Sequence, residues 1–165
     1  MADHVDMVLE QWHQRRPDLD VSPMGVIGRL NRVNRLISGE LEKTFARYDL
    51  DRASFDVLAT LRRSEPPHHL TPNDLVKSSM VTSGAVTQRL DRLEKRELVR
   101  RSRNEVDGRS VVVSLTDKGW DLINEVLPEH IATENRVLAG LTAKQRDTLA
   151  KTLRELLESL GDTQE

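Results

Sequence analysis

The chain has 165 residues, a formal net charge of −2 and an apolar share of 37%. This length supports one domain, and the apolar share is lean for a monomeric globule, which favours a dimer that supplies more buried surface. The chain contains no cysteine, which excludes disulfides and thiol chemistry. Its first residues form neither a basic start nor an apolar run, so we expect no membrane targeting and a cytoplasmic location.

Helical periodicity begins near the N-terminus. The first predicted helix should end near Arg16, because Pro17 disfavours helix in the residue before it. Its apolar stripe comprises Val5, Val8, Leu9 and Trp12. A linker is expected over residues 18–21.

Two further helices are predicted before the Pro66-Pro67 break. Ser22-Pro23 is expected to cap a long helix that ends about Tyr48. The next helix should run from after Asp51 to Arg63, and its broad apolar stripe predicts central burial.

A helix-turn-helix pattern follows between residues 70 and 96. Thr71 can cap a short helix, and Pro72 suits its first position because proline has no backbone donor to lose. A turn over residues 77–80 leads to a second helix over residues 81–96. The buried stripe of that helix is predicted to contain Val86, Leu90 and Leu93, which leaves its opposite side free for DNA.

A β hairpin is predicted directly after the second helix. Residues 98–103 and 110–115 alternate or are rich in β-branched side chains, and residues 104–109 form the turn between them. The order of short helix, second helix and basic hairpin is typical of a winged helix-turn-helix, in which the hairpin is the wing.

Two helices are expected after the wing. Thr116-Asp117 can cap the first, and Pro128 should kink this helix or mark its end. Thr142 should start the last helix, whose apolar face is wider than a monomer needs and indicates a partner helix. That face comprises Leu149, Leu153, Leu156, Leu157 and Leu160.

The predicted fold class is therefore mainly α with a small β wing, in one integrated domain. Residues 1–50 would supply N-terminal helices for dimerisation and a ligand site. Residues 51–115 would form the winged helix-turn-helix lobe, and residues 116–165 the C-terminal dimerisation helices.

Basic residues concentrate in the predicted recognition helix and wing: seven lie between Arg89 and Arg103, against three acidic residues. Ser83, Thr87 and Gln88 offer short hydrogen bonds to phosphates and base edges, and Arg92 lies on the same outward half. The alternative is structural, with Ser83 capping the helix and Arg92 pairing with a neighbouring Asp91 or Glu94.

The tip of the wing carries Asp107-Gly108-Arg109. We expect Arg109 to enter a narrow minor groove, where the negative potential is enhanced, and Arg103 to contact DNA from the same hairpin. Asp107 would stabilise the wing, although an ordinary turn aspartate beside Gly108 is an equally good interpretation.

The segment from Leu75 to Leu115 resembles the MarR family of bacterial transcription regulators. The resemblance rests on Ser83-Gly84, on Arg92-Leu93-Glu94 and on Asp107-Gly108-Arg109, in that order. It implies a homodimer with interlocked terminal helices and two winged lobes on a pseudo-palindromic DNA operator. An extra N-terminal helix with Trp12, followed by residues 16–20, resembles the urate-responsive subgroup of PecS-like and TamR-like proteins.

That resemblance also implies a ligand site. The matching positions in the subgroup, here Trp12, Asp56, Arg89 and Arg101, are associated with binding the ligand and transmitting its effect. Arginine pairs bind planar anions, and a new anion near Asp56 would repel it or displace its partner. Urate or another purine is the leading ligand, with a tricarboxylate such as trans-aconitate or an aromatic acid as competitors.

Three of these residues also have a plain structural interpretation. Trp12 can be a dimer-core anchor, Asp56 can pair with Arg52, and Arg89 can satisfy a structural carboxylate.

No enzyme signature is present, and no cofactor is expected. The five histidines show no zinc-ligand spacing, and the chain has neither a nucleophile elbow nor a phosphate-binding glycine loop. The alternative to a ligand-gated repressor is a winged-helix module for protein interaction or dimerisation that lacks ligand gating.

Overall fold

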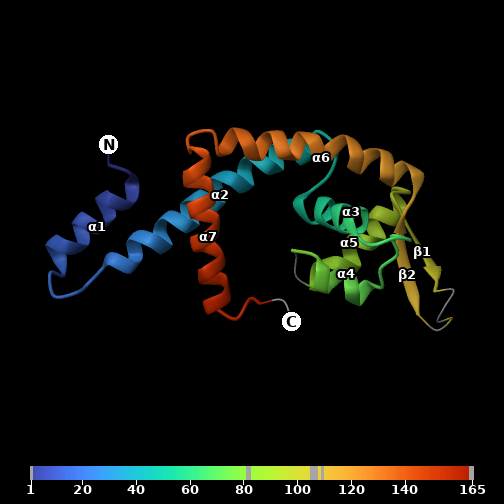
Figure 1. The fold of residues 1–165 in the computed structure, drawn as a ribbon, viewed down its shortest axis with the longest axis horizontal. Coiled ribbons are helices and arrows are strands. Elements are labelled where there is room, and N and C mark those ends of the chain that lie inside the picture. Colours follow the sequence, from blue (N-terminus) through green and yellow to red (C-terminus); the bar gives the residue numbers. More distant parts are fainter. Residues whose placement is uncertain (1, 81–82, 105–107, 109, 164–165) are drawn as a thin grey trace. The chain divides into compact units, whose positions relative to one another are not determined.

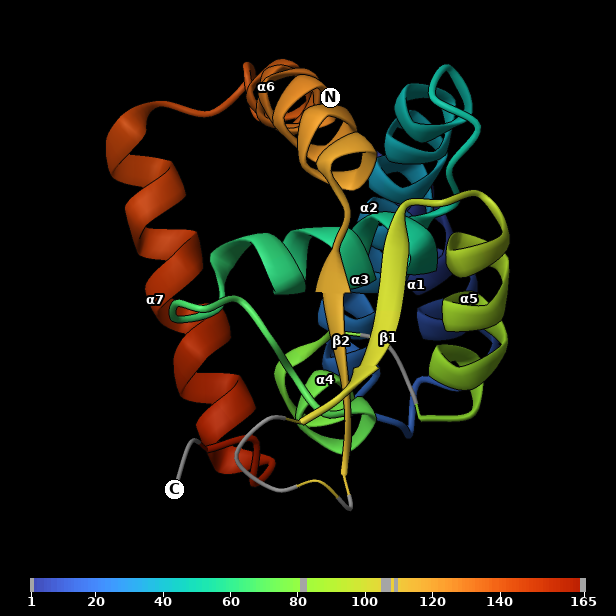
Figure 2. The ribbon, with the colours of Figure 1, turned by 90° about the vertical axis from the view of Figure 1, so that its right-hand side faces the viewer.

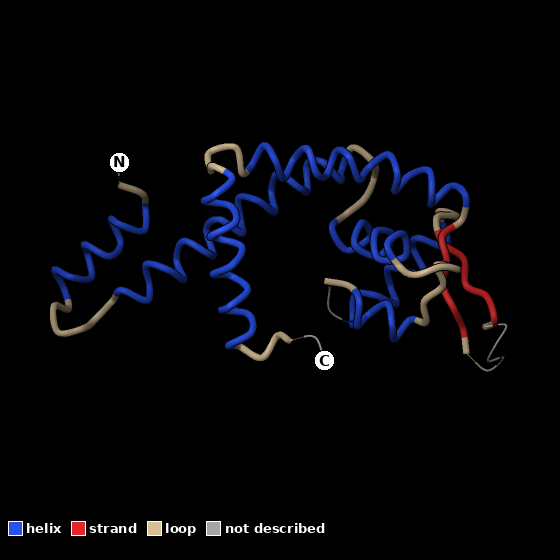
Figure 3. The backbone as a smooth tube through the Cα atoms, in the orientation of Figure 1, coloured by secondary structure: helices blue, strands red, loops and turns tan. Residues whose placement is uncertain are grey.

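The structure is a computed structural model that describes residues 2–80, 83–104, 108 and 110–163. Figures 1 and 3 show the predicted mainly helical class with one hairpin, which is confirmed. The helices are α1 (His4–Arg15), α2 (Ser22–Ala46), α3 (Arg52–Arg63), α4 (Pro72–Ser78), α5 (Ser83–Lys95), α6 (Asp117–Val137) and α7 (Ala143–Ser159). The strands are β1 (Val99–Arg103) and β2 (Val111–Leu115). The chain divides into two compact units, Met1–Arg52 and Ala53–Glu165.

In the first unit, α1 packs against α2 through a small apolar contact and a cluster of charges. Val5 is buried, and a Cβ on Gly28 would lie only 3.3 Å from its side chain, so the missing side chain lets the helices approach. Arg29 donates to Asp3 at 2.8 Å and to Asp6 at 2.5 Å. The pKa of Asp3 is lowered, first because its carboxylate accepts the Asp6 amide and further because of Arg29.

The start of α2 differs from the prediction. Ser22 is already helical, the capping position is Val21, and no side chain caps from there. The carboxylate of Asp20 instead accepts the Ser22 amide at 3.0 Å, which satisfies one of the free donors of the first turn. The helix ends at Ala46, two residues before the predicted end.

The second unit is built around α3, which buries residues on all sides, as its broad stripe predicts. The helix-turn-helix pair contributes Leu75 from α4 and Leu90 and Leu93 from α5, each at most 1% exposed. Burial of such side chains stabilises by roughly 1.5–3 kcal/mol each. The side chain of Val86, also predicted in this stripe, lies outside the described residues.

The wing is an antiparallel pair in which Val99 faces Leu115 and Arg103 faces Val111. Figure 2 shows β1 between β2 and α5. Leu70 joins this sheet through a bridge that the sequence did not reveal: its amide donates to the Val113 carbonyl at 3.1 Å and its carbonyl accepts from Val113 at 2.8 Å. The segment before α4 is thereby attached to the wing.

Helix α6 does not end at Pro128, although an end there was one of the two predicted outcomes. It continues beyond Pro128 to Val137, with Ile123, Val126 and Thr133 buried on either side of the proline. A proline inside a helix costs roughly 3 kcal/mol, and burial of Ile123 and Val126 offsets that cost. Thr116 caps α6 as predicted, accepting the Gly119 amide at 3.1 Å.

Helix α7 begins with the predicted cap at Thr142, which forms a capping box with Gln145. Arg146 joins it to the end of α6 by donating to the Leu138 carbonyl at 2.8 Å. None of the α7 residues is buried in the single chain. Within the described residues, no helix combines the length and apolarity needed to cross a bilayer.

Candidate nucleic-acid interface

The turn between α4 and α5 is fixed from α3. Thr71 caps α4 by accepting the Asp74 amide at 3.2 Å. Arg63 donates to the Ser78 carbonyl at 2.5 Å, and Asp56 accepts the Met80 amide at 2.7 Å. The segment that enters α5 is therefore fixed at two points by side chains of the buried helix.

Helix α5 has one buried and one exposed face. Leu90 and Leu93 are buried, whereas Gln88, Arg92 and Lys95 are exposed at the spacing of one helical stripe. The predicted contact residues Gln88 and Arg92 thus lie on the outward side. Ser83 and Thr87 belong to the first turns of α5, and their side chains lie outside the described residues.

The first strand of the wing, which follows α5 in the sequence, carries further exposed arginines. Arg100 is exposed and donates to Ser114 at 3.1 Å across the two strands. Arg103, at the far end of β1, is also exposed. Asp107 and Arg109, predicted at the tip of the wing, lie outside the described residues.

Arg101 connects β1 to α5. Its guanidinium donates to Glu94 at 2.6 Å and to Asp91 at 2.7 Å, and its backbone amide donates to Glu94 at 3.1 Å. Burial lowers the pKa of Arg101, but the hydrogen bonds to Asp91 and Glu94 outweigh that effect, so the pKa is raised above its ordinary value. Sequence reasoning missed this pairing, because it considered these two acids only as partners of Arg92.

The four predicted ligand residues are distributed over both units. Trp12 lies on α1 in the first unit, with 40% of its surface exposed. Asp56, Arg89 and Arg101 lie in the second unit. Asp56 is 9% exposed, and Arg89 is half-buried at the edge of the α5 stripe, as the helical periodicity predicts. Asp56 contacts Met80, three positions before the start of α5, and Arg101 contacts the last turns of α5.

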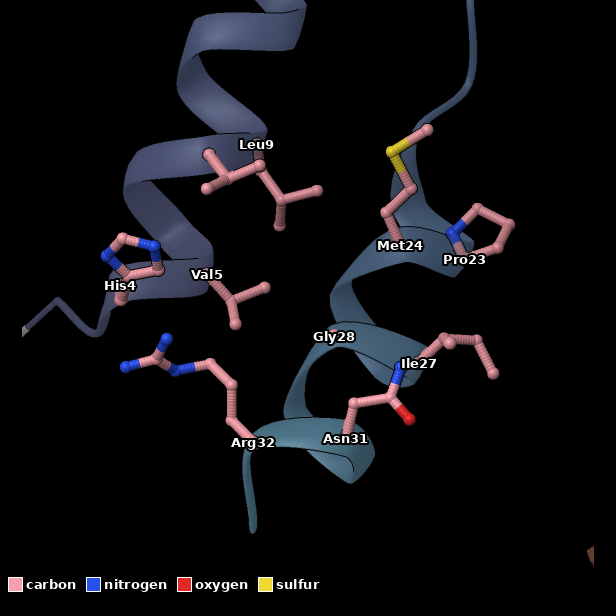
Figure 4. Close-up of a pocket in the computed structure, with 10 residues that line it drawn as sticks. His4, Val5, Leu9, Pro23, Met24, Ile27, Gly28, Asn31 and Arg32 are labelled. Atoms are coloured by element: carbon pink, nitrogen blue, oxygen red, sulfur yellow. The ribbon is translucent and has the colours of Figure 1, made fainter. Parts of the chain in front are cut away.

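The first unit also contains a groove of about 490 Å³ between α1 and α2. Figure 4 shows Val5 and Leu9 from α1 opposite Met24, Ile27 and Gly28 from α2. His4, Asn31 and Arg32 add polar groups to this mostly apolar lining. The sequence did not predict the groove, because it forms only when the two helices pack.

Comparisons with known proteins agree with this architecture. The model of the MarR family matches residues 48–110. The transcriptional regulator PecS of Dickeya dadantii is 43% identical over 149 residues, which cover 90% of each chain. The crystal structure of the MarR-family regulator AbsC from Streptomyces coelicolor covers 88% of this chain and 98% of its own, with 27% identity and a TM-score of 0.78.

A further similar structure is that of BpsR from Bordetella bronchiseptica, whose DNA binding is regulated by 6-hydroxynicotinic acid. It is 27% identical, covers 79% of this chain and 91% of its own, and has a TM-score of 0.72. The family and these relatives are regulators and not enzymes, as the sequence predicts. The winged helix-turn-helix together with identity to PecS along nearly the whole chain establishes that this protein belongs to the MarR family of transcription regulators, with a PecS-like sequence.

Proposed function

We propose that the protein is a homodimeric repressor that binds a pseudo-palindromic DNA operator and releases it when a small anionic metabolite such as urate binds. The observation that carries the ligand response is that two predicted ligand residues contact the chain shortly before α5 and in its last turns. Asp56 holds the Met80 amide before the helix, and Arg101 pairs with Asp91 and Glu94 in its last turns.

The exposed stripe of α5 supports DNA reading. Gln88 can bond base edges, while Arg92 and Lys95 can reach bases or phosphates from the same face. Arg100 and Arg103 extend the positive charge along the wing. Although the whole chain carries a charge of −2, this local concentration of cations suits a duplex, because binding depends on charge placement more than on the total.

An anion near Asp56 or Arg101 would act on α5 by electrostatics. It would repel the carboxylate that holds Met80, or it would compete with Asp91 and Glu94 for the guanidinium. Either change would loosen the segment before the recognition helix or its last turns. For operator release, the ligand must prefer the form that cannot bind DNA, since equal affinity for both forms shifts nothing.

The ligand class is a planar or multiply charged small anion. Urate and xanthine match paired guanidinium donors, and trans-aconitate offers carboxylates to the same groups. The regulation of BpsR by 6-hydroxynicotinic acid supports an aromatic anion as a further option. Arg89, in the same unit as Asp56 and Arg101, would add positive charge to the site.

Exposed apolar surface in each unit supports a homodimer. On α2, Val26, Ile27, Val33 and Leu36 are each more than half exposed. Leu157 on α7 is 49% exposed, and Leu160, the residue that caps the end of α7, is 75% exposed. Contiguous apolar surface of this kind is rare on monomers and marks association. Two copies would place two recognition helices on half-sites about 10 base pairs apart.

The test is a mobility-shift titration on DNA from upstream of the gene that encodes this chain. We expect specific binding that weakens as salt rises, because neutralised phosphates release counterions. Urate, xanthine, trans-aconitate, citrate and 6-hydroxynicotinic acid are then added separately at constant ionic strength. Sedimentation of the same samples gives the oligomeric state.

Release of the operator by one of these anions supports the proposal and identifies the ligand class. Binding that none of them relieves would contradict the ligand response and favour the structural interpretation of Arg89 and Asp56. A protein that binds no duplex specifically would instead point to the interaction module, and a monomer would contradict the two half-sites.

A further inference from the structure

The residues that end the recognition helix are bonded to the first turn of α6. Glu97 and Leu98 close α5: the Glu97 amide donates to the Glu94 carbonyl and the Leu98 amide to the Leu93 carbonyl, both at 2.9 Å. This is the pattern of a Schellman cap. Glu97 takes the left-handed conformation at φ 59°, which is unfavourable for a residue with a Cβ. Neighbouring contacts must therefore hold the turn.

Those contacts come from α6. The carbonyls of three consecutive residues, Arg96, Glu97 and Leu98, each accept a hydrogen bond from the start of this helix. Lys118 Nζ donates to the first at 3.0 Å, Thr116 Oγ1 to the second at 2.6 Å, and the Thr116 amide to the third at 3.1 Å. We call residues 96–98 and 116–119 the α5–α6 joint.

Thr116 has two roles in this joint. Its hydroxyl accepts the Gly119 amide at 3.1 Å, which caps α6, and donates to the Glu97 carbonyl at 2.6 Å. One hydroxyl therefore joins the first turn of α6 to the turn that follows α5. Valine has nearly the same shape without the hydroxyl, and serine keeps the hydroxyl.

The absence of a side chain at Gly119 lets the first turn of α6 lie close to the Leu98 carbonyl after α5. A Cβ at this position would lie 2.0 Å from the Leu98 carbonyl oxygen and 3.0 Å from its carbon. The obstacle is backbone and not a flexible side chain, so a methyl group would have to separate the end of α5 from α6. The Cβ would also lie 3.3 Å from the Leu115 side chain, a lesser obstacle than the carbonyl oxygen. Alanine suits a helix better than glycine, so a loss in this variant comes from these contacts and not from helix propensity.

We infer that Thr116 and Gly119 are positioning residues for the recognition helix, and that the α5–α6 joint makes the tilt of α5 follow the direction of α6. The joint holds the C-terminal end of α5, while Asp56 holds the entry to the helix through Met80. A change in α6, which a partner subunit or a ligand can impose, would reach the DNA-reading face through three carbonyls. This inference rests on the proposed DNA-binding function.

The test uses the full chain with Gly119→Ala, Thr116→Val and Thr116→Ser. Matched controls are available on the same unit. A Cβ on Gly140 would meet nothing within 4 Å among the described residues, so Gly140→Ala adds the same methyl group without a clash. Thr142 caps α7 as Thr116 caps α6, so Thr142→Val removes a cap remote from α5. Circular dichroism establishes that each variant is folded.

Two quantities are measured for each variant. The first is amide exchange of residues 93–98, which reports the joint without DNA. The second is the ratio of affinities for the operator and for a scrambled duplex of equal length. We expect faster exchange and a roughly tenfold lower ratio in Gly119→Ala, the effect of about one lost base contact. Thr116→Val should show a smaller loss that Thr116→Ser restores, while both controls keep the wild-type ratio.

The inference is overturned if folded Gly119→Ala and Thr116→Val both keep the wild-type ratio, whatever their exchange rates. It is also overturned if Thr142→Val lowers the ratio as much as Thr116→Val, since loss of a cap alone would then explain the effect. If the wild type discriminates no duplex, the proposed function fails, and exchange alone decides the joint. Faster amide exchange in Gly119→Ala and Thr116→Val, but not in the two controls, then supports the α5–α6 joint. Exchange equal to that of the wild type in both joint variants overturns it.

Discussion

The carboxylate of Asp56 on α3 accepts the backbone amide of Met80 at 2.7 Å, across 24 residues of sequence. Asp56 is 9% exposed, whereas Met80 itself is 85% exposed. A buried carboxylate therefore holds the backbone amide of an exposed residue three positions before the start of α5 at Ser83. Any agent that changes the charge at Asp56 changes what holds that segment.

Removal of this hydrogen bond should destabilise the lobe. Asp56→Ala leaves the Met80 amide without its acceptor, and we expect a loss of about 1–3 kcal/mol in the free energy of unfolding. Asp56→Asn keeps an acceptor oxygen and should lose less. Urea denaturation measures both, with Asp121→Asn on the exposed side of α6 as the control for charge. Equal stability of Asp56→Ala and the wild type would show that the bond contributes nothing.

Asp56→Asn also tests the ligand response separately from the fold. The neutral amide would not be repelled by a bound anion, so the variant should bind the operator and retain it in the presence of urate. A mobility shift at a fixed protein concentration gives the urate needed for half release. Release at the wild-type urate concentration would contradict a role for the Asp56 charge.

Arg100 and Arg101 are neighbours on β1 with different expected roles. Arg100 is exposed, so Arg100→Gln should weaken binding to all duplexes and reduce the salt slope by about 1 if it contacts a phosphate. Arg101 pairs with Asp91 and Glu94, so Arg101→Gln should lower operator affinity by loosening α5 and leave the salt slope unchanged. Affinity titrations at several salt concentrations separate the two effects, and identical slopes for both variants would refute the distinction.

Arg92 on the exposed stripe of α5 should contribute directly to operator binding. Arg92→Ala is expected to cost about 1–3 kcal/mol in operator affinity if it contacts a base, or to reduce the salt slope by about 1 if it contacts a phosphate. Arg154→Ala removes the same charge from the exposed surface of α7 and serves as the control. Equal losses in the two variants would indicate a nonspecific charge effect.

Docking of α1 on α2 should depend on pH through Asp3. The pKa of Asp3 lies below its ordinary value of 3.8 because its carboxylate accepts the Asp6 amide and a hydrogen bond from Arg29. The Asp6 bond lies within α1 and its N-cap, but the Arg29 bond joins α2 to α1, so docking favours the ionised form. This contribution is present above the ordinary value and is lost as pH falls through the lowered one. The Val5 methyl signals, which report the contact with Gly28, should shift in that range.

Asp3→Asn should remove this acid transition of the Val5 signals. Asp18→Asn is the control, because Asp18 also has a lowered pKa but pairs with Arg16 within the loop after α1. An acid transition that persists unchanged in Asp3→Asn would assign it to another group.

Local patterns of the sequence determined most of the secondary structure. Thr71, Thr116 and Thr142 cap helices as predicted, because a capping side chain bonds amides within three residues of itself. Periodicity, which is also local, predicted the buried stripe of Leu90 and Leu93 and the two strands of the wing. The order of these elements then indicated the family.

Contacts between distant residues were decided only by the tertiary structure. Continuation of α6 through Pro128 depends on burial of Ile123 and Val126, which outweighs the local preference for a break. The bonds from Asp56 to Met80 and from Arg101 to Glu94 join residues on different elements, as does the approach of Gly119 to Leu98. The sequence shows which side chains can form hydrogen bonds and ion pairs. Tertiary packing determines which of them do so with each other, because it brings distant residues within bonding distance.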